Sequence, residues 1–175
     1  MRLSSPAFAN GEPLPRRFAC DGENLSPPLQ WSGAPPGTLG FALVCTDPDA
    51  PRGTFHHWGV FDLPASTGKL TEGHVLYGMR GAVNDFGRTG YSGPCPPRGY
   101  GAHHYVFELF AVNVARLDCG LQPNCADVAR VARRHATAIA RLTGLYARGF
   151  EPGGGTGQRN SSSSTSSSSN WLKSS

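Results

Sequence analysis

The sequence predicts a mainly β protein with one folded domain. Its 175 residues include 23 Gly and 15 Pro, and most of these fall within the first 101 residues without a regular repeat. This distribution is typical of short strands joined by many tight turns. The hydrophobic fraction of 38% is enough for a buried core, and only one segment has helical periodicity.

Three segments have the composition of strands. Residues 41–47 (FALVCTD) form a nearly continuous apolar run that ends in a polar turn. Residues 56–63 (HHWGVFDL) and 103–112 (HHYVFELFAV) are rich in the aromatic and β-branched residues that favour strands. Residues 31–38 (WSGAPPGT) predict a turn through their Pro-Pro-Gly sequence.

The segment from Ala126 to Leu142 predicts the single helix. Its apolar stripe at helical spacing consists of Val128, Val131, His135, Ile139 and Leu142. Asn124 is a candidate N-cap, and Gly144 is expected to end the helix. The other face carries Arg130, Arg133, Arg134 and Arg141. This face is either solvated or a surface that binds membranes, and both alternatives stay open.

We expect a folded domain at residues 1–150 and a Gly/Ser-rich tail at residues 151–175. The tail contains too few apolar residues to offset its ordering entropy, so its composition predicts disorder. The sequence shows no apolar leader and no run long enough to span a membrane, so we expect a cytoplasmic protein without stable membrane insertion. A net charge of +4 is too small to indicate a nucleic-acid partner.

The five cysteines show no Cys-x-x-Cys spacing. Their odd number and irregular spacing favour free thiols. A local pair of Cys119 and Cys125 is the alternative.

Two distant segments each place a His-His pair beside a polar turn. The first is TDPDAPRGTFHHW at residues 46–58, and the second is NDFGRTGYSGPCPPRGYGAHHY at residues 84–105. Adjacent side chains of a strand point to opposite faces, so only one histidine of each pair can face a shared site. By this alternation, His57 shares a face with Phe61, and His103 shares a face with Tyr105 and Phe107. We therefore expect one polar site built from both segments.

Two kinds of chemistry at this site are alternatives to simple binding. A metal ion could use Asp47, Asp49, His57 and His103, but no zinc-binding spacing is present. A phosphoester hydrolase or another enzyme could use Asp47, His57 and His103, with Asp47 and His57 as an acid–base pair. The chain has no G-x-S-x-G, Walker A or G-x-G-x-x-G motif, which counts against several common enzyme classes.

A pocket for a small anion is the third hypothesis. Imidazoles can donate hydrogen bonds to an anion, and the Gly/Pro loop at residues 90–101 can present backbone N–H groups. Proline has no N–H, so the donors must come from Gly93, Cys95 or their neighbours. The Asp47 carboxylate would repel an anion unless it binds an imidazole, so we expect Asp47 to act through a histidine.

Three motifs together resemble the phosphatidylethanolamine-binding protein family, also called Raf kinase inhibitor protein-like, in its bacterial branch. They are CDGENLSPPLQW (20–31), TDPDAP followed by HHW (46–58), and NDFGRTGYSGPCPPRG with HHYVFELFA (84–111). The resemblance covers essentially the whole predicted domain. It implies a β-sandwich with Greek-key character, a few peripheral helices and a small anion pocket at one end.

The resemblance also implies a ligand site and a class of function. The implied ligand-binding residues are Asp47, Ala50, Pro51, His57, Gly93, Pro94, His103 and Tyr105. The implied function is non-enzymatic binding, without a cofactor, of a phospholipid head group or another phosphorylated group. Modulation of a kinase or protease is implied as a further role, and a homodimer stays open. His104 replaces an Arg that is common in the family, and we expect it to point away from the pocket.

Overall fold

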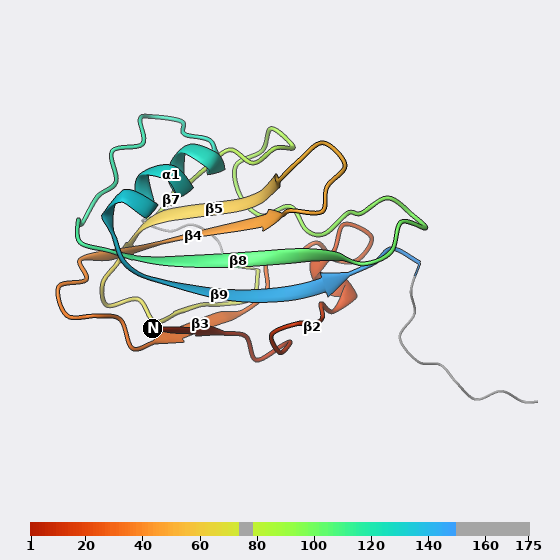
Figure 1. Cartoon of the computed structure of the whole chain (residues 1–175), viewed down its shortest axis with the longest axis horizontal. Coiled ribbons are helices and arrows are strands. Elements are labelled where there is room, and N and C mark those ends of the chain that lie inside the picture. The colour runs from red at the N-terminus through yellow and green to blue at the C-terminus, as the bar shows by residue number, and fades with distance from the viewer. Residues whose placement is uncertain (74–78, 150–175) are drawn as a thin grey trace, which may run out of the picture.

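Two β-sheets form the structure, which this computed structural model describes for residues 1–73 and 79–149 (Figure 1). The larger sheet has the strand order β2 (Glu12–Pro13), β9 (Ala136–Tyr146), β8 (His103–Val112), β4 (Gly40–Asp47), β5 (Phe55–Pro64) and β7 (Arg80–Gly81). The smaller sheet has the order β1 (Arg2–Ser4), β3 (Leu29–Ser32) and β6 (Lys69–Leu70). The described residues also contain a 3-10 helix, η1 (Arg16–Phe18), and one α-helix, α1 (Cys125–His135). The predicted mainly β class is confirmed.

The larger sheet is buried on both faces. One apolar cluster fills the space between the two sheets and includes Leu3, Trp31, Leu43, Trp58, Tyr105 and Phe107. A second cluster lies between the outer face of the larger sheet and α1, and it includes Val44, Phe61, Phe110, Val128 and Ala132. Burial on both faces explains why β4 reads as a nearly continuous apolar run. The predicted strands at 41–47, 56–63 and 103–112 correspond to β4, β5 and β8.

The predicted helix is right in its first part and wrong in its second. Asn124 caps α1, because its Oδ1 accepts a hydrogen bond from the Asp127 backbone N–H at 2.8 Å. The helix ends at His135, and residues 136–146 form β9, in which buried and more exposed side chains alternate. Pairing of β9 with β8 from His103–Tyr146 to Val112–Ala136 overrides the local helical pattern. Gly144, the predicted helix stop, lies inside this strand.

The expectation of free thiols is wrong for two of the five cysteines. Cys20 and Cys95 form a disulfide with a Cα–Cα distance of 5.4 Å across a sequence separation of 75 residues. Cys119 and Cys125 are free, so the proposed local pair is wrong, and Cys45 is also free. Sequence spacing cannot reveal a bridge between distant loops, because only the fold brings the two Cα atoms into range.

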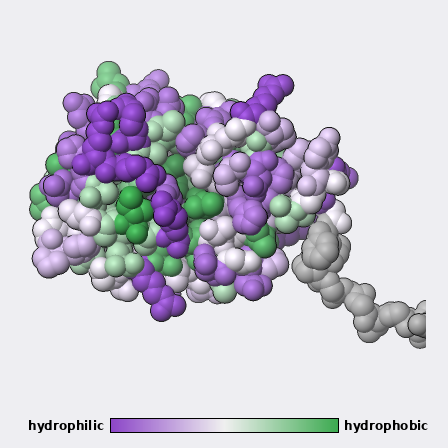
Figure 2. All heavy atoms as spheres, viewed as in Figure 1, coloured by the Kyte–Doolittle hydropathy of each residue, from purple (hydrophilic) through white to green (hydrophobic). Residues whose placement is uncertain are grey.

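Most of the arginines expected on one helix face are paired with acidic side chains. Arg133 and Arg141 both contact Glu108, at 2.9 and 2.7 Å, and Arg130 contacts Asp127 at 2.9 Å. Hydrophilic side chains cover much of the face in Figure 2, and the hydrophobic patches between them are small. No helix in residues 1–73 and 79–149 has the length and apolar character that a membrane span requires. The predicted tail at 151–175 lies outside the described residues.

Gly144 allows β9 to pack against the N-terminal segment. A Cβ at this position would lie 2.4 Å from Cγ of the buried Leu14. We predict that Gly144→Ala lowers the free energy of unfolding by about 1–3 kcal/mol, because the core must be overpacked. Chemical denaturation measures this loss.

Gly68→Ala is the matched control for this substitution. Gly68 has no positive φ, and a methyl group added there would have the Trp31 carbonyl oxygen as its nearest neighbour, at 3.8 Å, which is an ordinary contact. We expect a change within about 0.5 kcal/mol there. Equal losses in the two variants would show that close packing at Gly144 is not the cause.

Candidate functional site

The two predicted motifs meet at one end of the larger sheet. Because β4, β5, β8 and β9 are antiparallel neighbours, β4 and β9 end where β5 and β8 begin (Figure 1). Asp47 is paired with Phe55, and His103 is paired with Tyr146. The loop at residues 91–97, called here the Cys95 loop, closes the same end. This arrangement brings together Asp47, His57, Gly93, Pro94, His103 and Tyr105, and all six are buried.

Asp47 holds the imidazole of His103. The Asp47 Oδ2 atom lies 2.7 Å from Nδ1 of His103, and Asp47 Oδ1 accepts the backbone N–H of Asp49 at 2.9 Å. A carboxylate accepts hydrogen bonds, so Nδ1 of His103 carries the proton and Nε2 is directed away from Asp47. The enzyme alternative in the sequence analysis paired Asp47 with His57, whereas in the structure the histidine bonded to Asp47 is His103. The prediction that Asp47 acts through a histidine agrees with this contact.

A β-bulge determines the direction of His57. Cys45 is paired with Trp58, but Thr46 is paired with His56, so His57 is the extra residue in β5. The bulge places the His57 ring 5.2 Å from the ring of Tyr105, on the side of the core between the sheets. Phe61 lies on the opposite side, against α1. The expectation that His57 and Phe61 share a face is therefore wrong, because simple alternation assumes a regular strand.

The protonation of His57 is set by burial and one backbone contact. His57 Nδ1 lies 2.7 Å from the carbonyl oxygen of Ser92, and since a carbonyl only accepts, Nδ1–H is the donor. Burial lowers the pKa of His57 below its usual value, against the raising effects of Ser92 and Asp47. The neutral imidazole consequently keeps its lone pair on Nε2.

Tyr105 provides a polar group without a partner. Its side chain is fully buried, and its hydroxyl has no hydrogen-bond partner among the described residues. Burial, and then the Asp47 carboxylate, raise the pKa of Tyr105, so the hydroxyl keeps its proton. The backbone N–H of Cys95 lies close enough to lower this pKa slightly without forming a hydrogen bond. A buried hydroxyl without a partner is costly, and so it calls for a functional explanation.

The Cys95 loop is attached to residues 18–24, called here the Cys20 loop. The Gly93 N–H donates to Asn24 Oδ1 at 2.7 Å, and the Cys20 N–H donates to the Pro94 carbonyl at 3.0 Å. A Cβ on Gly93 would lie 2.0 Å from the Phe18 carbonyl oxygen, so only glycine fits there. The sequence analysis suggested the backbone N–H groups of Gly93 and Cys95 as donors to an anion. Because the Gly93 N–H already donates to Asn24, the Cys95 N–H is the one of these two that could donate to a ligand.

Several residues of the site were not recognised from the sequence. Ser92 accepts from His57, and buried Asn84 donates from Nδ2 to the Ser92 hydroxyl and to the His57 carbonyl, at 3.0 and 3.3 Å. Phe55 and Phe86 lie with their rings 5.2 and 5.4 Å from His57, and Phe86 is 43% exposed. The aspartate-containing NDFG sequence was a usable signal for Asn84 and Phe86. Nothing local marked Asn24.

Other predicted residues take a smaller part in this geometry. Ala50 and Pro51 lie in the turn after β4, where the Ala50 carbonyl accepts the Gly53 N–H at 3.0 Å. His104 points outward and binds Asp49 at 2.7 Å, as expected for the residue that alternates with His103. The two-histidine, two-carboxylate metal shell is not assembled, since the described part of the chain holds no group of three or more side chains suited to a metal ion.

The site is defined by its polar groups, because the two cavities described in the structure lie elsewhere. A cavity of about 440 Å³ is lined by other residues, among them Arg16, Asp21, Arg98 and Tyr146. A second cavity of about 630 Å³ lies near Arg2 and Trp31. None of the eight predicted ligand residues lines either cavity.

The fold and the site define a β-sandwich protein with a cluster of buried polar side chains at one end of its larger sheet. The sequence profile described as phosphatidylethanolamine-binding protein matches residues 4–147. The chain therefore belongs to the phosphatidylethanolamine-binding protein family. The predicted resemblance is confirmed.

Curated relatives and solved structures agree with this assignment. A UPF0098 protein of Aquifex aeolicus is 44% identical over 154 residues, covering 85% of this chain and 89% of that protein. LppC of Mycobacterium tuberculosis, whose name describes it as a lipoprotein, is 40% identical over 148 residues, covering 83% and 72%. The crystal structure of E. coli YBCL, a member of the mammalian PEBP family by its description, superposes with a TM-score of 0.77 at 33% identity, covering 83% and 97%.

We predict that His57 titrates below pH 6.5 in the ligand-free protein. Its pKa is lowered in the folded state, so the unfolded state binds more protons as the pH falls through 6.5. The stability that neutral His57 contributes is present above the unfolded pKa, and it is lost as the pH falls below that value. NMR titration of the imidazole C–H signals, assigned with His57→Gln, measures the pKa directly. A midpoint at or above 6.5 would contradict burial as the dominant influence.

Proposed function

We propose that this protein is a non-enzymatic binding protein for a small anion, in particular a phosphate-bearing group, at the site around Tyr105. The observation that carries the proposal is the fully buried Tyr105 hydroxyl, which has no hydrogen-bond partner among the described residues. A bound phosphate oxygen would accept this hydrogen bond and remove the cost of the unpaired group. Family membership supports a binding role at the coarser level.

The donors near Tyr105 suit an anion. The Cys95 N–H lies beside the Tyr105 hydroxyl, and it has no hydrogen-bond partner among the described residues. Asp47 accepts hydrogen bonds from His103 and from the Asp49 backbone, and these two donors offset part of its negative charge when the anion arrives. The Nε2 atoms of His57 and His103 are the remaining groups that would face the ligand, and each donates once its ring is protonated.

The anion and a proton should bind together. Neutral His57 offers a lone pair at Nε2, which repels an anion, whereas protonated His57 offers an N–H donor. A phosphate group that already carries a proton could instead donate to the lone pair. In both cases the complex holds one proton more than its separate partners, which are a dianion and a protein with neutral His57.

The edge of the site favours a ligand with an apolar or flat part next to the anion. Phe55 and Phe86 contact each other, with ring centroids 4.8 Å apart, and Phe86 is partly exposed beside His57. Ala50 and Pro51 would complete the wall on the side of the turn after β4. This environment suits a phosphate ester better than inorganic phosphate, because exposed aromatic surface gains from covering apolar groups.

Two further aspects of the function stay predictions. Modulation of a kinase or protease is implied by the family resemblance, and the same is true of a homodimer. A cytoplasmic location is less favoured than the sequence suggested, since disulfides such as Cys20–Cys95 persist mainly in oxidising compartments. We propose that the protein functions in a compartment that is oxidising enough for the Cys20–Cys95 disulfide to form.

Titration with phosphate and phosphorylethanolamine, by calorimetry or NMR, tests the proposed function. We expect binding to wild type, a loss of at least tenfold in affinity for His57→Ala and His103→Ala, and a similar loss for Tyr105→Phe. Tyr105→Phe should leave the free energy of unfolding unchanged or higher, because it deletes an unpaired buried hydroxyl. Loss of affinity without loss of stability identifies the hydroxyl as a ligand group.

Tyr146→Phe is the matched control. The Tyr146 hydroxyl donates to Asp21 Oδ1 at 2.6 Å, so its removal should cost about 0.5–1.5 kcal/mol of stability and leave anion affinity unchanged. Absence of binding to wild type would refute the anion site. Turnover of a phosphoester, abolished by Asp47→Asn, would replace the binding proposal with the hydrolase alternative.

We predict that anion affinity rises as the pH falls, by up to about tenfold per pH unit, until it levels off below the pKa of ligand-free His57. Because the pKa of His57 is lowered, this rise continues below pH 6.5 before it levels off. Sulfate is the probe to titrate, because it stays a dianion throughout this range whereas phosphate changes its own charge. Constant sulfate affinity between about pH 5.5 and 8 would exclude histidine protonation as part of binding.

A further inference from the structure

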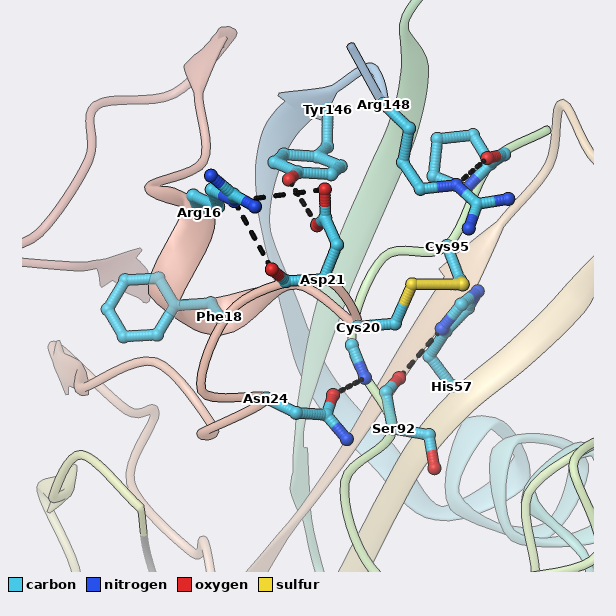
Figure 3. The surroundings of a disulfide bond; sticks show 12 residues. Arg16, Phe18, Cys20, Asp21, Asn24, His57, Ser92, Cys95, Tyr146 and Arg148 are labelled. Carbon is cyan, nitrogen blue, oxygen red and sulfur yellow. Dashed lines mark hydrogen bonds and ion pairs between the residues drawn. A yellow bond between two sulfur atoms is a disulfide. The ribbon is translucent and has the colours of Figure 1, made fainter. Parts of the chain in front are cut away.

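The disulfide between Cys20 and Cys95 lies within the candidate site. Cys95 carries the backbone N–H that approaches the Tyr105 hydroxyl, and it follows Ser92 and Gly93 in the loop that also positions His57. Figure 3 shows His57 and Ser92 on one side of the disulfide and Asp21 and Tyr146 on the other. A change at the sulfur atoms therefore acts on a residue that the anion would contact.

The Cys95 loop depends on outside contacts for its position. Pro94, Pro96 and Pro97 have no N–H, so the loop can form few hydrogen bonds of its own. Its N-terminal part is attached by Tyr91 Oη to the Phe18 carbonyl at 2.8 Å and by the Gly93 N–H to Asn24. Beyond Pro94, the described attachments to other segments are the disulfide and the bond from Arg148 Nε to the Pro96 carbonyl at 2.6 Å.

Reduction would disturb this fit. Two thiol sulfurs need van der Waals separation, which is larger than the distance between bonded sulfurs, so the two side chains must turn away from each other or the loops must move apart. The Tyr91 hydroxyl and the Gly93 N–H hold their part of the loop to Phe18 and Asn24, so this part stays attached to the Cys20 loop. The displacement would therefore pass to Cys95 and its N–H. Both cysteines are partly exposed, which gives a reductant access to them.

We propose that the Cys20–Cys95 disulfide is a reversible redox control of the anion site, which binds strongly when the disulfide is formed and weakly when it is reduced. The proposal rests on the proposed anion-binding function and adds a modification site to it. The co-reactant is a dithiol, either a small molecule or the dithiol site of an oxidoreductase.

The exchange reaction balances in two steps. A thiolate of the dithiol attacks one sulfur of the disulfide, the Cys20–Cys95 bond breaks, and a mixed disulfide forms while the released cysteine takes up a proton. The second thiolate of the reductant then displaces the remaining cysteine, which also takes up a proton. Two electrons pass to the protein, Cys20 and Cys95 become thiols, and the reductant becomes a disulfide.

The test compares phosphate affinity of the oxidised full-length protein with that of the same protein reduced by dithiothreitol, with NMR spectra confirming that both are folded. We expect reduction to weaken binding at least fivefold, within the range usual for coupled sites. By reciprocity, saturating phosphate should make the disulfide harder to reduce by the same factor. For a fivefold effect, the reduction potential becomes more negative by about 21 mV.

Matched variants separate this effect from other thiol chemistry. The double variant Cys20→Ser, Cys95→Ser should bind phosphate as weakly as the reduced protein and should not respond to dithiothreitol. Cys119→Ser, which removes a partly exposed free thiol, should keep the full response. If the double variant does not fold, the potential measured on wild type with and without phosphate still decides the question.

The possible outcomes distinguish failure of redox control from failure of the proposed function. Phosphate binding that is equal in the folded oxidised and reduced proteins, with no shift of potential, would overturn redox control and leave the proposed function intact. Absence of phosphate binding to the oxidised protein would overturn both. An unchanged redox response in the double variant would show that another cysteine is responsible and would also overturn the proposal.

Discussion

The backbone at Gly93 lies directly against the backbone at Phe18, and the architecture of the site depends on this contact. A side chain at position 93 would overlap the Phe18 carbonyl oxygen, so the two loops can meet only where glycine stands. Their approach allows Asn24 to accept the Gly93 N–H and allows Cys20 to reach Cys95. It also fixes Ser92, whose carbonyl sets the tautomer of His57. The arrangement of polar groups at this site is therefore a consequence of loop packing as much as of the strands that carry its histidines.

The strands determine the direction in which the side chains of the site point. Asp47 and His103 come from neighbouring antiparallel strands whose ends coincide, and so an ordinary register brings their side chains together. His57 needs an irregularity, because without the bulge beside Trp58 its ring would turn toward the helix-covered face. One extra residue thus decides whether the second imidazole joins the site. Bulges commonly occur beside functional sites for this reason.

The sequence predicted the parts of the structure that depend on local chemistry. The strands β4, β5 and β8, the cap at Asn124, and the two motifs that meet at the end of the sheet all follow from composition, alternation and resemblance. The errors share a different origin. Residues 136–146 repeat apolar residues at helical spacing, but pairing with β8 made them a strand. The disulfide and the role of Asn24 depend on loops that are distant in sequence, and no local pattern encodes that distance.

The balance of donors and acceptors reconciles the proposed anion binding with the carboxylate that lies in the same site. Asp47 accepts hydrogen bonds from His103 and from the Asp49 backbone, so two donors offset part of its charge and the carboxylate orients an imidazole. The groups left over are a tyrosine hydroxyl that burial keeps protonated and a backbone N–H, and both can donate. The Nε2 atom of His57 changes its character with pH, from acceptor to donor. Under the proposed function, fixed donors together with a switchable imidazole would select the charge and the protonation state of the ligand, and the family's name alone specifies neither.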